Sequence, residues 1–275
     1  MIFMPSFSVV RLRGCKPLVD KFLTLAQALA EIAGEAIMPY YEAELEVETK
    51  ADNSPVTEAD KAAEAAMREL IGKTFPEHGI YGEEHGITLA QPQSQYTWVL
   101  DPIDGTRAFI EGRKEWGTLI ALCEDGQPIL GILNQPATKE RWIGIKGQPT
   151  TYQRTPCESR TGIALADAEI STTSAMHFTP VQAKEFVSLA ESCRRVVKDG
   201  DCYAYGLLAR GERDLVVDAG LKPYDILALA PIIEGSGGAI THWDGAPITL
   251  NHYANVVAAG DKHLHAQALS LLQGA

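Results

Sequence analysis

Cysteine is scarce in this sequence and occurs in no disulfide or metal-binding pattern. The five cysteines are odd in number and widely spaced, and there is no C-x-x-C pair. This spacing supports neither a disulfide framework nor a structural zinc site. The sequence also lacks any apolar run near the roughly 20 residues that a helix needs to cross a bilayer. We therefore predict a reduced, cytoplasmic protein that has no membrane partner.

Positive charge is also in short supply. The 275 residues include 24 Lys and Arg against 36 Asp and Glu, which gives a formal net charge of −12. A surface this negative repels nucleic-acid phosphates, so the composition predicts no nucleic-acid partner. A small anionic substrate can still bind where cations are recruited locally. Hydrophobic residues make up 45% of the chain, which is ordinary for a globular protein.

The patterning divides the chain into two halves. Apolar residues at helical spacing predict one helix over 17–41 and another that begins after Thr57. A Pro-, Thr- and Gln-rich stretch over 148–159 marks the predicted boundary between the halves. We expect residues 1–150 to form an N-terminal α+β domain that carries most metal ligands. Residues 151–275 are expected to form a C-terminal α/β domain that completes the substrate site.

Strand and helix patterns differ between these halves. The first half carries predicted strands at 97–100, 117–124, 129–134 and 141–146. The second half alternates predicted strands at 169–173, 195–198, 214–218, 239–243 and 256–259 with predicted helices at 179–192, 202–210, 224–234 and 261–273.

The most informative segment follows the strand at 97–100. Asp101 and Asp104 lie three positions apart with Pro102 fixing the backbone between them, so their carboxylates can converge on one point. Convergent carboxylates repel each other unless a cation lies between them, and oxygen ligands favour Mg²⁺. Gly105 and Thr106 follow where a helix begins, and their backbone N–H groups can bind a phosphate. A capped Asp-Gly turn is the alternative, which the preceding strand and the following Gly-Thr disfavour.

Other acidic residues are less informative when each is considered alone. Glu83 and Glu84 also fit a solvated loop, Asp60 fits a helix cap, and Asp225 in a first helical turn fits the helix dipole. Taken together, several acids without a matching His or Cys cluster indicate a site for more than one Mg²⁺. A phosphate cradle beside such a site indicates phosphate chemistry. No nucleotide-binding phosphate loop is present, so water is the simplest acceptor.

These motifs resemble the inositol monophosphatase superfamily of Mg²⁺-dependent, lithium-sensitive phosphatases. The resemblance rests on the string from Asp101 to Thr106 (Asp-Pro-Ile-Asp-Gly-Thr), on the upstream Gly-Glu-Glu, and on Asp225 before a helix that ends in 234–238. It extends over nearly the whole chain from about residue 20. It implies an α+β / α/β fold, a layered α-β-α-β-α sandwich of the inositol monophosphatase / fructose-1,6-bisphosphatase type. It also implies a homodimer.

The resemblance assigns roles residue by residue. Two or three Mg²⁺ would be ligated by Glu83, Asp101, the carbonyl of Ile103, Asp104 and Asp225, with Glu84 in a second shell or reaching a weaker third ion through water. Thr106 and Asp60 match the catalytic pair that orients and deprotonates the attacking water, and Glu83 serves beside them. Gly105 and Thr106 would hold the phosphate. Lys50 matches a mobile flap near the third metal.

Three segments favour the histidinol-phosphate phosphatase branch of the superfamily. Where inositol enzymes continue Thr-Asn-Phe, this chain has Arg107-Ala-Phe-Ile, and Lys-Pro-Tyr precedes Asp225 in place of a Trp-Asp pair. The segment 200–206 also resembles that branch. Histidinol phosphate carries an ammonium and an imidazole, which favour acidic and aromatic neighbours.

The predicted substrate-binding residues are Asp218, Asp201, Arg107 and Tyr203. Asp218 ends an apolar strand and matches a hydroxyl-binding Glu of the inositol enzymes; the other three also fit a loop cap, a surface ion pair and a packed aromatic. The predicted function is hydrolysis of L-histidinol phosphate to L-histidinol and phosphate. One alternative is an inositol-1-monophosphatase or a broad sugar-phosphate phosphatase. An alternative of another class is a regulatory RNA-polymerase-associated binding protein.

Overall fold

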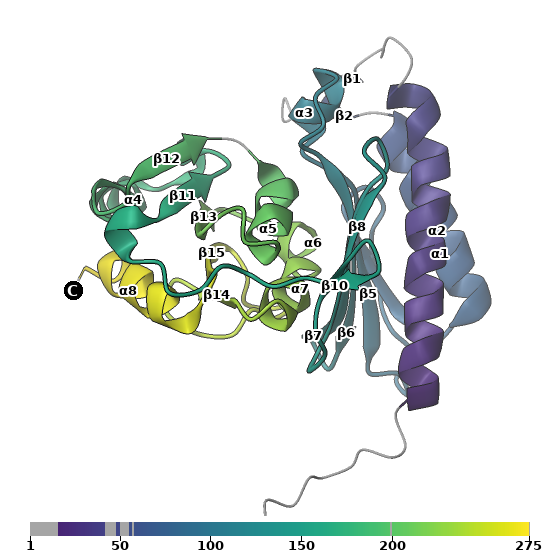
Figure 1. Cartoon of the computed structure of the whole chain (residues 1–275). Helices are drawn as coiled ribbons and strands as arrows, with labels where there is room; N and C mark the ends of the chain where they lie inside the picture. Colours follow the sequence, from purple (N-terminus) through teal and green to yellow (C-terminus); the bar gives the residue numbers. More distant parts are fainter. Residues whose placement is uncertain (1–15, 42–47, 50–54, 57, 199, 275) are drawn as a thin grey trace, which may run out of the picture.

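Two long helices form the first layer of the molecule. The computed structural model describes residues 16–41, 48–49, 55–56, 58–198 and 200–274. Helices α1 (Lys16–Tyr41) and α2 (Glu58–Thr74) pack together against one face of the first sheet (Figure 1). Their apolar residues recur every three or four positions and are buried, as the spacing predicted. Thr57, expected to precede α2, lies outside the described residues.

The first sheet is built mostly from consecutive antiparallel strands. Its order is β10-β9-β8-β7-β6-β5-β3-β4, and only β3 and β5 pair in parallel among its described strands. Its strands are β3 (Gly79–Gly82), β4 (Gly86–Thr88), β5 (Tyr96–Asp104), β6 (Gly117–Glu124), β7 (Gln127–Gln135), β8 (Glu140–Ile145), β9 (Thr151–Tyr152) and β10 (Thr155–Pro156). Strands β1 (Glu48–Thr49) and β2 (Pro55–Val56) form a separate antiparallel pair.

The second sheet is smaller and mixed, in the order β12-β11-β13-β15-β14. Its strands are β11 (Glu169–Thr172), β12 (Arg195–Lys198), β13 (Leu215–Ala219), β14 (Ala239–His242) and β15 (Asn255–Ala259). The remaining α-helices are α3 (Thr106–Ile110), α4 (Pro180–Glu191), α5 (Asp201–Ala209), α6 (Pro223–Ile226), α7 (Leu229–Gly235) and α8 (Lys262–Leu272).

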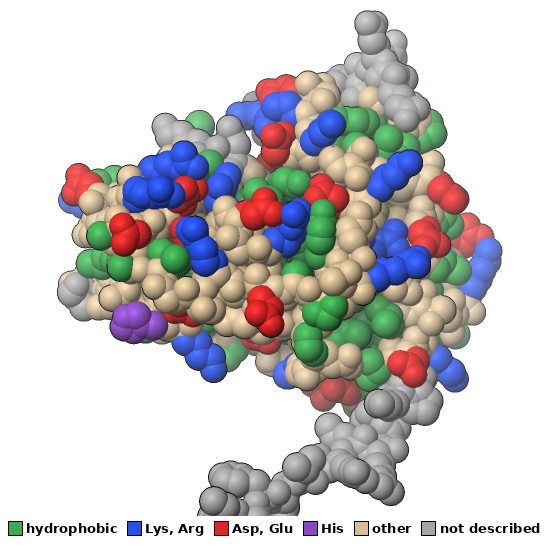
Figure 2. All heavy atoms as spheres, in the orientation of Figure 1, with side chains coloured by type: hydrophobic (Ala, Val, Ile, Leu, Met, Phe, Trp, Pro, Cys, Tyr) green, Lys and Arg blue, Asp and Glu red, His purple; other side chains and the backbone are tan. Residues whose placement is uncertain are grey.

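The elements stack in five layers. Helices α1 and α2 cover one face of the first sheet, α5 to α7 lie between the two sheets, and α4 and α8 cover the outer face of the second sheet (Figure 1). Three clusters of buried apolar residues fill the space between the layers: one beneath α1 and α2, one around the middle helices between the two sheets, and one beneath α4 and α8. This arrangement confirms the predicted α-β-α-β-α sandwich. On the face shown in Figure 2, acidic and basic side chains are interspersed. Among the described helices, none combines the length and apolar composition needed to span a bilayer.

The structure differs from the sequence expectations in three elements. The helix expected over 224–234 is divided into α6 and α7, because Pro231 lacks the N–H that would bond to the carbonyl of Leu227. The short strands β3 and β4 were not predicted. The hairpin β9–β10 lies within the stretch expected to be a linker, and it extends the first sheet to Pro156. The division of the chain into domains at residue 150 stays a prediction.

Candidate active site

The end of β5 carries the centre of the acidic site. Asp101 pairs with Leu119 of β6 and Asp104 with Gly117, so three steps on β5 match two on β6. Such a bulge bends the strand and re-aims its side chains. Gly105 then adopts φ 84°, a left-handed conformation that suits glycine, and α3 begins at Thr106. The Thr106 hydroxyl donates to the carbonyl of Ile103 at 3.1 Å.

Two neighbouring elements bring further acids to this strand end. Strand β3 runs parallel to β5, so the turn after β3 places Glu83 at the same sheet edge, where its N–H donates to the Leu100 carbonyl at 3.3 Å. Helix α2 supplies Asp60, which is buried. Helix α6 supplies Asp225, whose Oδ2 accepts the backbone N–H of Lys222 at 2.7 Å.

These carboxylates form two overlapping sets. Oxygens of Asp60, Glu83 and Asp101 lie within 4.8 Å of one another, and so do oxygens of Asp101, Asp104 and Asp225. Asp101 belongs to both sets. Elements separated by more than a hundred residues in the sequence therefore converge on one carboxylate.

Burial and mutual repulsion perturb the acids of the site. Burial, and then the charges of Glu83, Asp104, Asp225 and Asp60, raise the pKa of Asp101 well above its usual value. Burial followed by the charge of Asp201 does the same to the pKa of Asp104. Burial raises the pKa of Asp225 to about 7, against the hydrogen bond from Lys222. Without a nearby positive charge, the repulsion between these carboxylates disfavours their simultaneous ionisation.

The donor set fits a hard divalent cation. Oδ1 of Asp101 is buried and has no hydrogen-bond partner in the described part of the chain. Carboxylate oxygens at this spacing are the ligands that Mg²⁺ prefers. The nearby Cys202 belongs to neither set of acids in the described structure, and burial raises the pKa of its thiol well above the usual value. A cation among these acids would supply the missing partner and relieve their repulsion.

Nearly the whole chain matches one family of proteins. The profile of the inositol monophosphatase family matches residues 18–275. The chain belongs to the inositol monophosphatase family. This confirms the resemblance drawn from the motifs, and the chain is a phosphatase of the phosphoric monoester hydrolase type.

Several family members align with nearly the full length of the chain. It is 44% identical over 262 residues to the chloroplastic bifunctional phosphatase IMPL2 of Arabidopsis thaliana, covering 93% of this chain and 76% of that protein. It is 34% identical over 257 residues to the histidinol-phosphatase of Mycobacterium tuberculosis, covering 91% of this chain and 97% of the relative. The solved structure of an inositol monophosphatase from Zymomonas mobilis is 46% identical, with a TM-score of 0.84 over 92% of this chain and 98% of that one.

The other ligands and phosphate-binding groups expected of this family member lie around the two acidic sets. The carbonyl of Ile103, Gly105 and Thr106 follow directly from Asp101. Glu84 is next to Glu83 but belongs to neither set of described acids. Lys50 lies outside the described residues. The ligand and catalytic roles assigned to these residues stay predictions.

Two of the four expected substrate residues face a cavity beside the acids. This cavity, of about 160 Å³, is lined by Asp104, Asp201, Asp218 and Asp225 among others. Asp218 is buried and accepts hydrogen bonds from Tyr205 Oη at 2.9 Å and Thr173 N at 2.7 Å. Burial raises the pKa of Asp218.

The other two expected substrate residues lie farther from the acids. Arg107 lines an adjoining cavity of about 660 Å³, which shares Asp201 with the smaller one. Tyr203 lines neither cavity in the described structure; its hydroxyl donates to Glu140 Oε2 at 2.9 Å, and its ring packs edge-on against Trp142.

Sequence reasoning missed Glu64, which holds the turn that carries Glu83. The Glu64 carboxylate is fully buried and accepts the backbone N–H groups of Glu84 at 2.6 Å and His85 at 3.1 Å. Its ion pair with Arg68 Nε, at 2.7 Å, compensates the charge. Gly82 permits this approach, because a Cβ there would overlap the Glu64 carboxylate. The available signal was the spacing of Glu64 four residues after Asp60, which places both on one helix face.

Proposed function

We propose that this phosphatase hydrolyses L-histidinol phosphate to L-histidinol and phosphate, with Mg²⁺ as its cofactor. The proposal is supported by the similarity to the Mycobacterium tuberculosis histidinol-phosphatase and by a second relative of that name from Streptomyces coelicolor, 34% identical over 264 residues. It also agrees with the charge of the cavity that adjoins the acidic sets.

The acidic wall of the cavity is the observation that carries the substrate proposal. Four aspartates and no Lys or Arg occur among its described lining residues. With cations bound to Asp104 and Asp225, Asp201 and Asp218 remain to face a positively charged group on the substrate. An ammonium beside them gains an ion pair in addition to hydrogen bonds, whereas the hydroxyl groups of an inositol phosphate gain hydrogen bonds alone.

Different residues of the site bind the phosphate and activate the attacking water. The backbone N–H groups of Gly105 and Thr106, at the start of α3, orient the phosphate for in-line attack. The Thr106 hydroxyl and the buried Asp60 carboxylate orient the attacking water, and Asp60 accepts its proton. When bound, Mg²⁺ supplies a Lewis acid that neutralises the charge developing on the phosphoryl group. The two overlapping acid sets would hold two ions, and Asp101 belongs to both sets.

Hydrolysis of inositol 1-phosphate or a related sugar phosphate is the second candidate. The similarity to the inositol monophosphatase of Zymomonas mobilis favours it. A regulatory role has weaker support: the Nus factor SuhB of Pasteurella multocida is 28% identical over 251 residues, covering 88% of this chain and 92% of SuhB. A protein that only binds a partner has no use for the complete acidic set, so the regulatory role is the weaker candidate.

Replacement of Asp201 tests the proposed substrate directly. Its φ of 37° is one that Asn tolerates, so Asp201→Asn removes the charge with little strain. We expect kcat/KM for histidinol phosphate to fall about 10- to 100-fold, as for loss of a charged hydrogen bond, and kcat/KM for myo-inositol 1-phosphate to change little. Asp167→Asn, at an exposed position away from the cavity, is the matched control. An equal change for both esters would contradict the proposal.

A further inference from the structure

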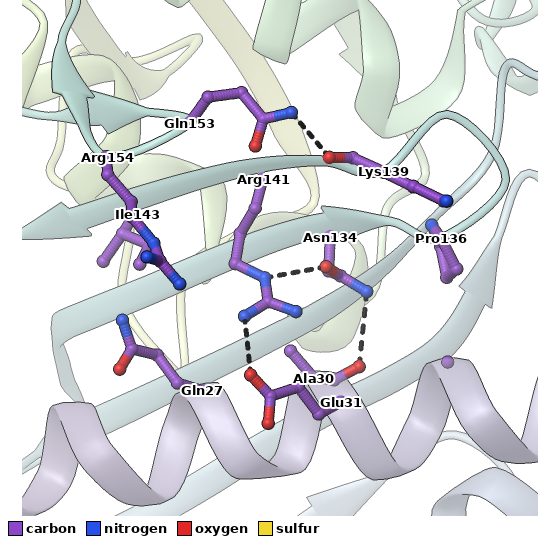
Figure 3. A pocket seen from close by; sticks show the side chains of 11 residues that line it. Gln27, Ala30, Glu31, Asn134, Pro136, Lys139, Arg141, Ile143, Gln153 and Arg154 are labelled. Carbon is purple, nitrogen blue, oxygen red and sulfur yellow. Dashed lines mark hydrogen bonds and ion pairs between the residues drawn. The ribbon is translucent and has the colours of Figure 1, made fainter.

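A further cavity, with a polar lining, lies on the opposite face of the first sheet from α7. It has a volume of about 550 Å³ and lies between α1 and strands β7 and β8 (Figure 3). Side chains alternate along β8, so Arg141 and Ile143 face α1 while Trp142 packs into the core between the sheets. None of the residues expected to bind metal or substrate lines this cavity. The predicted chemistry of the active site therefore does not explain it.

Positive charge is concentrated in this cavity although the whole chain is acidic. Lys139, Arg141 and Arg154 line it together with a single acid, Glu31. Lys139 and Arg154 have no hydrogen-bond or ion-pair partner for their charged groups among the described residues, although the chain contains 36 Asp and Glu. Two cations are thus available to a ligand.

The third cation is held in place by the walls of the cavity. Arg141 Nε donates to Asn134 Oδ1 at 2.8 Å, and the buried Asn134 amide donates to the Ala30 carbonyl at 3.3 Å (Figure 3). A nitrogen of Arg141 lies 3.6 Å from Glu31 Oε1, beyond good hydrogen-bond distance. These contacts orient the guanidinium before any ligand arrives, which lowers the entropic cost of binding.

The backbone at the cavity rim is strained. Lys139, Gln153 and Arg154 have φ values of 61°, 50° and 66°, and they are three of the five non-glycine residues with positive φ in the described chain. Gln153 and Arg154 form the two-residue turn between β9 and β10, where Asn-Gly is the favoured pair. Left-handed backbone costs roughly 1–2 kcal/mol for a residue with a Cβ. The β6–β7 turn of the same sheet uses the ordinary pair Asp125-Gly126.

Backbone strain persists in folded proteins mostly at functional sites. Because the side chains of the three strained residues line one cavity, we expect these side chains to bind a ligand there. We propose that this cavity is a binding site for a compact oxyanion carrying two or more negative charges, as phosphate or carboxylate groups. Arginine guanidinium groups recognise both chemistries with paired hydrogen bonds. Three cations against one acid match a ligand of charge −2 or more, and 550 Å³ accommodates a small metabolite but no folded partner.

The proposal is tested with inorganic diphosphate and citrate as probes, by calorimetry on the metal-free chain. The acids of the active site repel both probes when no Mg²⁺ is present, and the part of the binding that the turn variant loses reports this cavity. The test variant replaces Gln153 and Arg154 together by Asn and Gly (Gln153→Asn with Arg154→Gly). We expect the variant to bind the preferred probe at least about tenfold more weakly, a change of about 1.4 kcal/mol. Its melting temperature should rise, because the turn strain is removed.

Lys184→Asn, an exposed lysine on α4 that lies outside the cavity, removes one charge as a control and should leave binding unchanged. Preference for diphosphate identifies a phosphate ligand, and preference for citrate identifies a carboxylate ligand. Failure of the unmodified chain to bind either probe at millimolar concentration would overturn the proposal. So would binding that the turn variant retains in full.

Discussion

Asp101 connects the two halves of the acidic site, because its carboxylate lies within ligand distance of both sets of acids. One of its buried oxygens has no hydrogen-bond partner among the described residues, and burial, followed by the charges of the neighbouring acids, raises its pKa well above the usual value. The folded protein thus stores unfavourable electrostatic energy that a bound cation releases.

The repulsion between these acids predicts that the stability of the metal-free protein falls as pH rises. Asp101, Asp104 and Asp225 bind protons more tightly in the folded chain than at their ordinary pKa of 3.8, and the pKa of Asp225 rises to about 7. The folded state therefore holds more protons between these values, and the stability contributed by these groups falls as pH rises from about 4 to about 7. Chemical denaturation in EDTA, followed across this range, measures the effect.

Two controls separate this effect from other titrations. Adding Mg²⁺ should abolish the loss of stability at neutral pH. The Asp101→Asn variant should show a smaller change of stability with pH in the metal-free protein. A metal-free profile that rises steadily from pH 4 to 7 would contradict the electrostatic account of the site.

Glu64 gives the second prediction at the scale of single residues. Glu64→Gln keeps the shape but weakens the charged contacts to Glu84 N, His85 N and Arg68. Because these contacts orient the turn that carries Glu83, we expect Mg²⁺ affinity to fall about 10- to 100-fold. Saturating Mg²⁺ should restore most of kcat. Activity measured against Mg²⁺ concentration distinguishes this positioning role from a loss of folded protein.

The same helix offers a matched control for Glu64. Glu69 pairs with Lys73 on the exposed face of α2, where ion pairs contribute little. Glu69→Gln should leave the Mg²⁺ dependence unchanged. If both variants behave alike, Glu64 does not position the turn.

The predictable part of the site was the part encoded locally. Asp101 and Asp104 lie at the end of the buried strand β5 in one short string, which the motif alone identified. Glu64 escaped notice because a glutamate in a polar helix is usually solvent-exposed, and its burial depends on a turn twenty residues away. The hydrogen bond of Tyr203 to Glu140 was also not evident from the sequence, because it joins residues 63 positions apart; the substrate-binding role of Tyr203 stays a prediction.

At the scale of elements, close contact between β7 and the helices in the middle layer positions Asp225. Gly131 lies against the backbone of Ala228, and an added Cβ would overlap its carbonyl oxygen. We therefore expect Gly131→Ala to destabilise the fold by about 1–3 kcal/mol. It should also weaken Mg²⁺ binding, because the displaced segment includes Asp225. Thermal unfolding with and without Mg²⁺ measures both effects.

Gly72 provides the contrasting substitution. It lies within α2 and has no atom within 4 Å of an added Cβ. Gly72→Ala should stabilise the protein by about 0.5–1 kcal/mol through helix propensity, and the response to Mg²⁺ should not change. If the Gly131→Ala and Gly72→Ala variants are equally stable, the close contact between β7 and Ala228 does not contribute to the stability of the fold.

Strands with a clear apolar pattern and a turn signal were predicted closely from the sequence. The strand at 117–124 has the predicted bounds, and Asp125-Gly126 forms the turn that follows it. The short β3 and β4 were missed, because glycine-flanked strands of three or four residues carry no period. Their pairing depends on β5, which no local pattern reveals.

At the scale of the whole molecule, the layers separate two regions of opposite charge. The acids of the predicted active site lie at the end of β5, whereas the cationic cavity lies beneath α1 on the far side of β8. The net charge of −12 gave no indication of the second region, because composition does not report where charges gather. The homodimer and the cytoplasmic location implied at the outset stay predictions.

The most direct test of the account is phosphate release from two esters by the unmodified protein in Mg²⁺. L-Histidinol phosphate and myo-inositol 1-phosphate are compared by kcat/KM under the same conditions. We expect a preference of about a hundredfold for histidinol phosphate, which corresponds to about 2.7 kcal/mol of transition-state discrimination. Equal rates, or a preference for the inositol ester, would contradict the assignment of the acidic cavity to a cationic substrate.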